Sequence, residues 1–564
     1  MARGMTPGKG VGLLLGAAAI FYVVDRAVEH GRLVMAAGGR VNDVLPAIPG
    51  AIAGDPFRIS TDPLDLISGL AAAVVLALIV LYTIAGKQNT RPGEEHGSAA
   101  WAKPADIKPY LAPDRDATRQ LQFTQTEALS VDTFRTRRNC NVLVIGASGT
   151  GKTRSYILPN LRHLDASTAI TDPSGEIIRD TQEGLAARGI TVKSLNLIDL
   201  AQSAQFNPMR YFDPDSPETS IAMLSDTIMM NTSGKDSRGD AFWERAEKAL
   251  LTAIVAYVWA TTPHTLKQEP NLLGALDLLK GMDGSEENKD ARESETDLKF
   301  IAARDVVAEW QEAPNGDDDP RVMDVLQYAC DQYRTYEQGP VETRKSVVIS
   351  LAVRLAPLDM REVRRILATD TLGIDRLGYE PTAMFLQIPD THATFKFIAA
   401  MFWQSLFEQS VYQADHEPDG RLPRMLHCFL DEFANIGRIP NFERHISTIR
   451  KRQISVSMVF QNYAQGEEMF EKSWHTVIGN CDTKLFLGGD DPQTTKWVSE
   501  MLGAETIVSK DTSRTYGMTG SWSESTRTMR RNLLDPDEVG RLDNGEALLM
   551  IRGLRPFRSK KISF

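Results

Sequence analysis

The sequence predicts an α/β protein with a doubly wound, largely parallel sheet, an inserted all-helical segment and an N-terminal membrane region. Three observations predict this fold class. Short apolar runs rich in β-branched residues alternate with helical stretches. A glycine-rich loop, 146–153, follows the first of these runs. Two long runs without charged residues lie within residues 1–90.

Residues 1–90 are predicted to contain two transmembrane helices, at about 10–25 and 66–86. A transmembrane helix needs about 20 consecutive apolar residues, and the second run satisfies this length. The first run is short and can also be interpreted as a signal peptide, because Arg3 and Lys9 precede it. Both interpretations place the rest of the chain in the cytoplasm. We therefore expect a protein of the cell membrane with a cytoplasmic body.

Length and charge limit what the body can be. A chain of 564 residues is too long for one compact domain, so two or three folded units are expected. The net charge of -11 excludes a surface that is basic throughout, and any contact with nucleic acid must therefore be local. The four cysteines lie far apart in the sequence, which argues against a zinc site or a disulfide framework.

Eight short runs are predicted as strands: 141–145, 167–172, 191–197, 383–388, 425–431, 454–460, 483–488 and 546–551. Between about 217 and 372 the apolar residues instead recur at helical spacing, which predicts an inserted all-helical segment. The acidic stretches 283–297 and 316–319 are expected to be solvated loops within it. The Ser/Thr-rich stretch Thr506–Thr528 is predicted to be a mobile loop.

The loop GASGTGKT, 146–153, matches the phosphate-binding pattern GxxxxGK[ST] in full and lies between a strand and a helical stretch. Its backbone N–H groups are expected to cradle the phosphates of ATP. Lys152 should reach the β- and γ-phosphates, and Thr153 should bind Mg²⁺. The predicted nucleotide-binding residues are Gly146, Ala147, Ser148, Gly149, Thr150, Gly151, Lys152 and Thr153.

A second acidic motif follows the strand MLHCFLDE, 425–432. A carboxylate pair that ends a buried strand is costly unless it meets a cation, which favours a Walker B site over a structural role. Asp431 is predicted to hold Mg²⁺, and Glu432 to polarise the attacking water.

Two further residues are candidates for catalysis. Gln461 follows the strand 454–460 and is placed to sense the γ-phosphate or to orient the attacking water, although an ordinary amide at a strand end is the alternative. The basic run 444–453 contains Arg450. This run is either a solvated basic face or the source of an arginine finger that reaches the ATP of a neighbouring subunit.

With these motifs in place, the chain resembles the type IV secretion coupling proteins, the TraG/TraD-like conjugation ATPases related to FtsK-type DNA translocases. The resemblance covers most of the chain. It rests on the segments HGSAAWA (96–102), TDPSGE (171–176), FWERAEKALL (242–251), the block from FLDEF to VFQN (429–462), GNCDTKLFLGG (479–489) and IRGLRPF (551–557). The pattern is closest to the branch found on integrative elements of Gram-positive bacteria. Many relatives have Lys where Ser174 stands, which leaves the role of this position open.

The resemblance implies a hexameric RecA-like motor that accepts a relaxase bound to single-stranded DNA and passes it to the secretion channel. Arg450 matches the arginine finger of the family. The domains are then a membrane region (1–90), two parts of a RecA-like nucleotide-binding domain (91–216 and 373–564) and an inserted all-alpha domain (217–372). The alternative function is a membrane-tethered substrate receptor that uses ATP as a conformational switch without pumping DNA. The same Walker residues would serve it.

Overall fold

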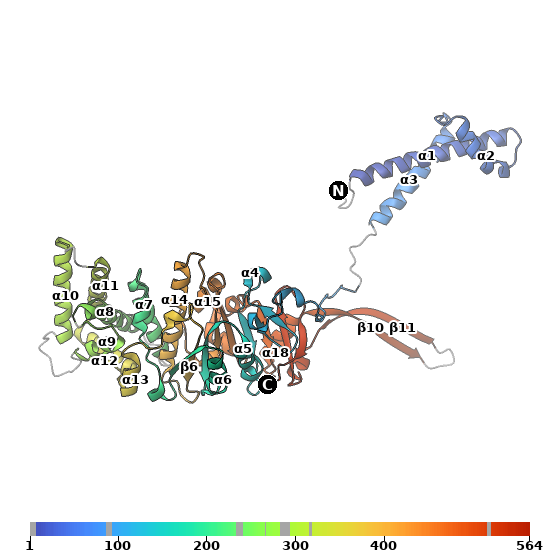
Figure 1. The fold of residues 1–564 in the computed structure, drawn as a ribbon. Coiled ribbons are helices and arrows are strands. Elements are labelled where there is room, and N and C mark those ends of the chain that lie inside the picture. Colours follow the sequence, from blue (N-terminus) through green and yellow to red (C-terminus); the bar gives the residue numbers. More distant parts are fainter. Residues whose placement is uncertain are drawn as a thin grey trace. The chain divides into compact units, whose positions relative to one another are not determined.

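The computed structural model describes residues 7–85, 93–232, 241–265, 267–282, 294–314, 319–515 and 521–563. The chain forms two compact units, Met1–Glu95 and His96–Phe564 (Figure 1). The predicted boundary between residues 90 and 91 lies outside the described residues.

The N-terminal unit is formed by α1 (Pro7–Ala36), α2 (Val41–Gly54) and α3 (Pro63–Ala85). Helices α1 and α3 pack closely at Gly69, where an added Cβ would lie 2.8 Å from the backbone oxygen of Phe21. The helix predicted at about 10–25 is too short, because α1 continues to Ala36. The i,i+3 ion pair between Arg26 and Glu29 supports this extension, and Gly38 with φ +81° follows its end.

Among the described residues, one helix is long and apolar enough to cross a membrane. Its apolar window is Pro63–Val80 in α3, with a mean hydropathy of 2.3. This window overlaps the predicted span 66–86, whose last residue lies outside the described residues. The described part of α1 does not reach the same criterion, so a second membrane span stays a prediction.

The second unit is built on a nine-stranded sheet. In spatial order its strands are β13 (Phe557–Lys560), β12 (Glu546–Ile551), β9 (Thr483–Phe486), β3 (Val142–Ile145), β8 (Ile454–Phe460), β7 (Leu426–Leu430), β4 (Ser167–Pro173), β6 (Thr382–Ile388) and β5 (Thr191–Asn196). The strands from β9 to β5 are parallel, β12 is antiparallel to β9, and β13 is antiparallel to β12 and therefore runs in the same direction as β9. All eight predicted strands are therefore confirmed as members of one largely parallel sheet.

Helices cover both faces of the sheet, and successive residues of β3 enter different cores. Leu143 and Ile145 face a core with α14 (Lys396–His416), α15 (Phe442–Thr448), α16 (Tyr463–Phe470), α17 (Trp474–Gly479), α18 (Pro492–Leu502) and α19 (Pro536–Gly540). Val142 and Val144 face a core with α5 (Leu158–His163), α6 (Glu176–Ala187) and the small hairpin of β1 (Gln120–Gln122) and β2 (Ala128–Ser130), which α4 (Thr133–Thr136) follows. Burial on both faces explains why β3 is continuously apolar.

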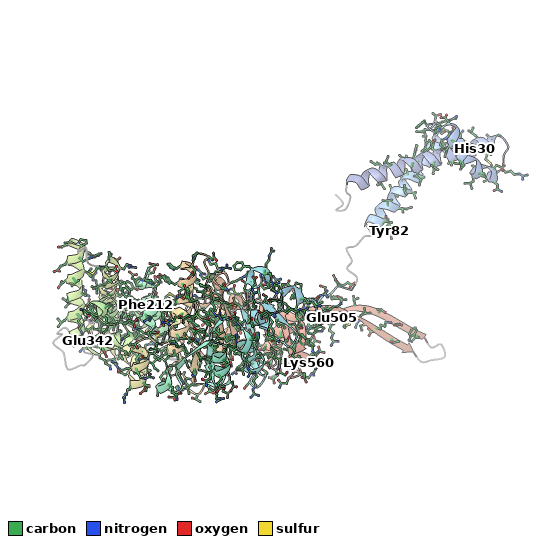
Figure 2. All side chains as sticks on the ribbon, in the orientation of Figure 1. His30, Tyr82, Phe212, Glu342, Glu505 and Lys560 are labelled. Carbon is green, nitrogen blue, oxygen red and sulfur yellow. The ribbon has the colours of Figure 1, made fainter. Side chains whose placement is uncertain are left out.

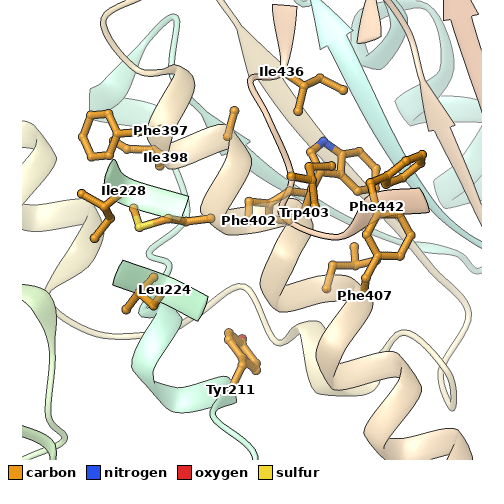
Figure 3. Packing of buried hydrophobic residues seen from close by; sticks show 14 of the residues in the cluster. Tyr211, Leu224, Ile228, Phe397, Ile398, Phe402, Trp403, Phe407, Ile436 and Phe442 are labelled. Carbon is orange, nitrogen blue, oxygen red and sulfur yellow. The ribbon is translucent and has the colours of Figure 1, made fainter. Parts of the chain in front are cut away.

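Between β5 and β6 the described residues form no strand. The helices of this segment are α7 (Pro217–Thr232), α8 (Ala241–Thr265), α9 (Leu272–Lys280), α10 (Glu295–Glu312), α11 (Pro320–Glu337), α12 (Val341–Leu355) and α13 (Arg361–Leu367). Leu224 and Ile228 of α7 pack beside Phe402 and Trp403 of α14, so these helices share a core with the sheet (Figure 3). Most of the predicted acidic loops 283–297 and 316–319 lies outside the described residues. The end of the first prediction is wrong, because α10 begins at Glu295.

The prediction of a mobile loop at Thr506–Thr528 is wrong. Strands β10 (Ala504–Thr515) and β11 (Ser521–Asn532) form an antiparallel hairpin that projects from the sheet unit (Figure 1). The composition of mostly Ser, Thr and charged residues hid the pairing of the two strands, which places Ile507 opposite Met529.

The segment HGSAAWA (96–102) contacts the first residues of β10. Ser98 forms an isolated antiparallel β-bridge with Glu505, whose position is labelled in Figure 2. An added Cβ on Gly97 would lie 2.1 Å from the backbone oxygen of Ala504. Only glycine fits this approach, which gives the segment a structural role at the entry to the sheet unit.

Candidate nucleotide site

The loop 146–153 lies at the carboxyl edge of the sheet, directly after β3. Gly149 and Gly151 have φ angles of +78° and +83°, which favour glycine. An added Cβ on Gly146 would lie 2.6 Å from Oγ1 of Thr150, and this hydroxyl donates to the carbonyl oxygen of Ala147 at 2.8 Å. A π-helical turn, Thr153–Ile157, then begins the following helix. The glycines therefore permit the tight loop that the motif predicts.

The side chain of Lys152 folds back onto the phosphate loop. This side chain is largely buried, and Nζ donates to the carbonyl oxygen of Ala147 at 3.2 Å. Burial lowers the pKa of Lys152, while the charges of Asp431 and Glu432 oppose that shift. Within the described residues this buried ammonium group donates only to a neutral carbonyl, so it is suited to receive a phosphate.

The structure brings the two predicted Mg²⁺ ligands together. Oγ1 of Thr153 donates to Oδ2 of Asp431 at 2.8 Å, across a sequence separation of 278 residues. Asp431 follows β7 and exposes only 3% of its surface. Burial raises its pKa to about 6; the hydrogen bond from Thr153 opposes this shift, and the charge of Glu432 adds to it. A carboxylate and a hydroxyl beside a phosphate loop fit Mg²⁺, which binds proteins through few side chains and takes phosphate oxygens as well.

Glu432 is held by a residue that the sequence analysis missed. Its backbone is left-handed, with φ +47°, and Nδ2 of Asn435 donates to its Oε2 at 2.9 Å. A left-handed conformation in a residue other than glycine is strained and frequent at functional sites. The spacing of three residues between the acid and the amide was the available signal, but it is too common in turns to be specific.

Gln461 follows β8, which lies between the strands that lead to the phosphate loop and to Asp431. The carbonyl oxygen of Phe460 accepts from the backbone N–H of Gly146 at 3.1 Å, so the end of β8 is bonded to the start of the loop. The backbone N–H of Gln461 donates to Oε1 of Gln465 at 2.9 Å. Gln461 therefore shares the carboxyl edge with the other candidate residues.

Arg450 does not join them. It precedes β8 and therefore lies at the amino edge of the sheet, where Nη2 donates to the carbonyl oxygen of Thr133 at 3.0 Å. Within the described part of the chain no carboxylate forms an ion pair with it. It lines a cavity of about 370 Å³ that also contains Arg119, Arg421 and Arg424. Within one copy of the chain, Arg450 and the phosphate loop therefore lie at opposite ends of the parallel strands β8 and β3.

The segment TDPSGE ends β4 and begins α6. The carboxylate of Asp172 accepts from the backbone N–H groups of Ile177 at 3.0 Å and Ile178 at 2.8 Å, and burial raises its pKa to about 6. Ser174 has φ +69° and lies in the turn between strand and helix. The segment therefore caps a helix here, and no contact of Ser174 with the phosphate loop appears among the described residues.

Lys561 is the second residue that the sequence analysis missed. Its Nζ donates to the carbonyl oxygen of Thr150 at 2.8 Å, although 411 residues separate the two in sequence. The surrounding cavity has a volume of about 610 Å³ and adjoins the phosphate loop. The residues next to Lys561 in the sequence form no motif that would predict this contact.

The chain matches known proteins over most of its length. The family model for type IV secretory system conjugative DNA transfer matches residues 101–564. The conjugal transfer protein TraG of Rhizobium radiobacter is 23% identical over 425 residues, which cover 74% of this chain and 60% of that protein. The protein VirD4 of Rhizobium radiobacter is 19% identical over 510 residues, which cover 88% of this chain and 67% of that protein. The chain thus spans about 60% of the length of the TraG relatives that it matches.

Solved structures show the same fold at low sequence identity. The plasmid coupling protein TrwB in complex with the GTP analogue GDPNP has a TM-score of 0.56 at 13% identity, over 85% of this chain and 97% of that one. TrwB in complex with ADP and Mg²⁺ has a TM-score of 0.52 at 12% identity, over 84% and 95%. The sheet unit therefore has an α/β nucleotide-binding fold, whereas the Gram-positive branch stays a prediction. With a family model that covers the sheet unit almost completely, this chain belongs to the type IV secretory system conjugative DNA transfer family.

Proposed function

We propose that this chain is the coupling ATPase of a conjugative type IV secretion system. It recruits a relaxase bound to single-stranded DNA and drives the transfer of this substrate through the secretion channel. The observation that carries the proposal is the 2.8 Å contact between Thr153 and Asp431, the two predicted Mg²⁺ ligands, in a member of a conjugative DNA transfer family. The TraG and VirD4 relatives support the same role.

Each candidate residue at the carboxyl edge is assigned a role in ATP hydrolysis. The backbone N–H groups of the loop 146–153 hold the phosphates, and Lys152 neutralises charge on the β- and γ-phosphates. Thr153 and Asp431 would hold Mg²⁺, which when bound supplies positive charge between the phosphates. Glu432, positioned by Asn435, accepts a proton from the attacking water. Gln461 orients this water from the end of β8.

The position of Arg450 supports a ring of identical subunits. Within its own chain the guanidinium lies at the opposite edge of the sheet from the phosphate loop. Because the guanidinium cannot reach its own nucleotide, it acts on the γ-phosphate of a neighbouring copy. We infer a RecA-like homo-hexamer in which the amino edge of one subunit meets the carboxyl edge of the next.

The membrane region anchors this motor. Helix α3 is long and apolar enough to span a bilayer, and α1 is the second span of the proposed hairpin. The nucleotide-binding domain (91–216 and 373–564) and the inserted all-alpha domain (217–372) then lie in the cytoplasm, where ATP and the DNA substrate are present.

ATP turnover by the full-length protein in detergent, with and without single-stranded DNA, tests the proposal. A pump should hydrolyse ATP faster when DNA is added, and Lys152→Ala should abolish both rates. A receptor that uses ATP only as a switch should show slow turnover that DNA leaves unchanged. Displacement of a labelled strand from a DNA template supplies the second measurement, since a motor moves along DNA and a switch does not.

A further inference from the structure

Lys561 is held over the phosphate loop by segments that are far apart in the sequence. Its backbone N–H donates to the carbonyl oxygen of Gly545 at 2.8 Å, and its carbonyl oxygen accepts from Nε2 of Gln125 at 2.9 Å. Its Nζ donates to the carbonyl oxygen of Thr150 at 2.8 Å and to Oδ1 of Asn544 at 3.4 Å. Backbone and side chain are thus both fixed before any ligand arrives.

The ammonium group of Lys561 is buried and forms no ion pair within the described residues. The residue exposes only 7% of its surface, and both hydrogen-bond acceptors are neutral. No carboxylate oxygen of the described residues lies within 4.0 Å of its Nζ. Burial lowers the pKa of Lys561, with Asp543 as the opposing charge. Because an unpaired buried charge is costly, it indicates a site at which an anion binds.

The cavity beside Lys561 has the size and the position for part of a nucleotide. Its volume of about 610 Å³ lies within the usual range for ligand sites. Gly149–Gly151 and Arg154 line one side, and Asp543–Glu546 and Lys560–Ser563 line the other. Asp431, Glu432 and Gln461 do not line it. The cavity therefore adjoins the phosphate loop on a side away from the residues assigned to Mg²⁺ and the γ-phosphate.

We propose that this cavity receives the nucleoside and the α-phosphate of the bound nucleotide, and that Lys561 binds the α-phosphate. The inference deepens the proposed ATPase function and rests on nucleotide binding by the phosphate loop. Lys561 then supplies from the end of the chain a charge that is independent of Lys152. A phosphate of single-stranded DNA has the same chemistry, so the test separates the two sources.

Calorimetric titration of the full-length protein in detergent with ADP and with a non-hydrolysable ATP analogue, both with Mg²⁺, tests the role of Lys561. Lys561→Met should raise the Kd of both nucleotides by the same factor, about ten- to a hundredfold, because a charge-assisted hydrogen bond to a phosphate common to both is lost. Lys561→Arg should restore most of the affinity. Lys496→Met, which removes an exposed lysine on α18, is the matched control and should bind as the wild type does.

A short single-stranded oligonucleotide supplies the second arm, and its Kd should be the same for Lys561→Met and wild type. The binding stoichiometry reports the folded fraction separately from Kd, so partial misfolding does not mimic the result. Unchanged nucleotide affinity in Lys561→Met would overturn the inference, and so would a loss confined to the ATP analogue or to the oligonucleotide. A failure of the proposed pump function would give a different result. ATP turnover would then not respond to DNA, while Lys561→Met would still raise the Kd of both nucleotides.

Discussion

The two edges of the central sheet carry different and complementary chemistry. At the carboxyl edge, Lys152, Thr153 and Asp431 lie together, and no arginine of the described residues is hydrogen-bonded to Asp431 or Glu432. At the amino edge, Arg450 faces a cavity with three other arginines and has no phosphate loop near it. Among the described residues, the carboxyl edge therefore has the phosphate loop and the acidic pair, and the amino edge has Arg450 and its neighbouring arginines. In the proposed ring, two copies that dock edge to edge would bring the arginine of one edge to the phosphate loop of the other.

Removal of the loop lysine should have the largest effect on this arrangement. Lys152→Ala deletes the charge that meets the β- and γ-phosphates, so both binding and transition-state stabilisation are lost. We expect ATP turnover to fall to the assay background, while the protein stays folded and in the membrane. Lys496→Met is the control for loss of a lysine elsewhere. Normal nucleotide binding and DNA transfer by Lys152→Ala would rule out the ATPase function.

Arg450→Ala tests the opposite edge. Arginine fingers contribute about 10³–10⁵ in rate, so we expect near-normal nucleotide affinity and hydrolysis reduced by that order. Arg444→Ala, an exposed arginine in the same basic run, should retain nearly full activity. Wild-type turnover by Arg450→Ala would leave this residue as part of a solvated basic face.

Mixed rings decide whether Arg450 acts on a neighbouring subunit. Rings of Lys152→Ala and Arg450→Ala subunits contain interfaces at which an intact loop faces an intact arginine, so part of the ATP turnover should return. Each variant assembled only with itself is the control. Co-assembled rings without any recovery would show that the two edges do not meet.

Glu432→Gln distinguishes the two acids of the carboxyl edge. The amide keeps the shape and the partner Asn435 but cannot accept the proton of the attacking water, so nucleotide binding should persist while hydrolysis falls by about 10²–10⁴. Asp431→Asn should instead weaken the Mg²⁺-dependent part of nucleotide binding. Calorimetric titration with and without Mg²⁺ separates the two outcomes. Identical behaviour of both variants would contradict the assigned roles.

The smallest effect concerns the stability of the nucleotide-free protein. The pKa of Asp431 is raised from 3.8 to about 6 in the folded state. The folded state therefore holds an extra proton between these pH values, and stability falls as the pH rises through this window. Asp431→Asn removes the charge and should stabilise the nucleotide-free protein at pH 7.5 by up to about 3 kcal/mol. Thermal unfolding in one detergent at pH 7.5 and at pH 4 checks this, since the difference should shrink at the lower pH.

Local pattern predicted most of the sheet unit. The eight strands were recognisable as short runs rich in apolar and β-branched residues, and the phosphate loop because its glycines permit backbone angles that other residues disfavour. The hairpin of β10 and β11 was missed. Its residues are mostly Ser, Thr and charged side chains, which occur equally in loops, and only the pairing of one strand with the other distinguishes the two.

The sequence by itself determined the strands, the phosphate loop and the acidic pair, since each depends on residues that are close neighbours along the chain. Only the tertiary structure decided which of these residues meet. Thr153 bonds to Asp431 across 278 residues, and Lys561 bonds to Thr150 across 411. The parallel pairing of β3 with β8 also decided that Arg450, which precedes β8, lies at the edge away from the loop that follows β3. Contacts of this kind depend on how the strands pack into one sheet, and no local pattern of residues specifies that order.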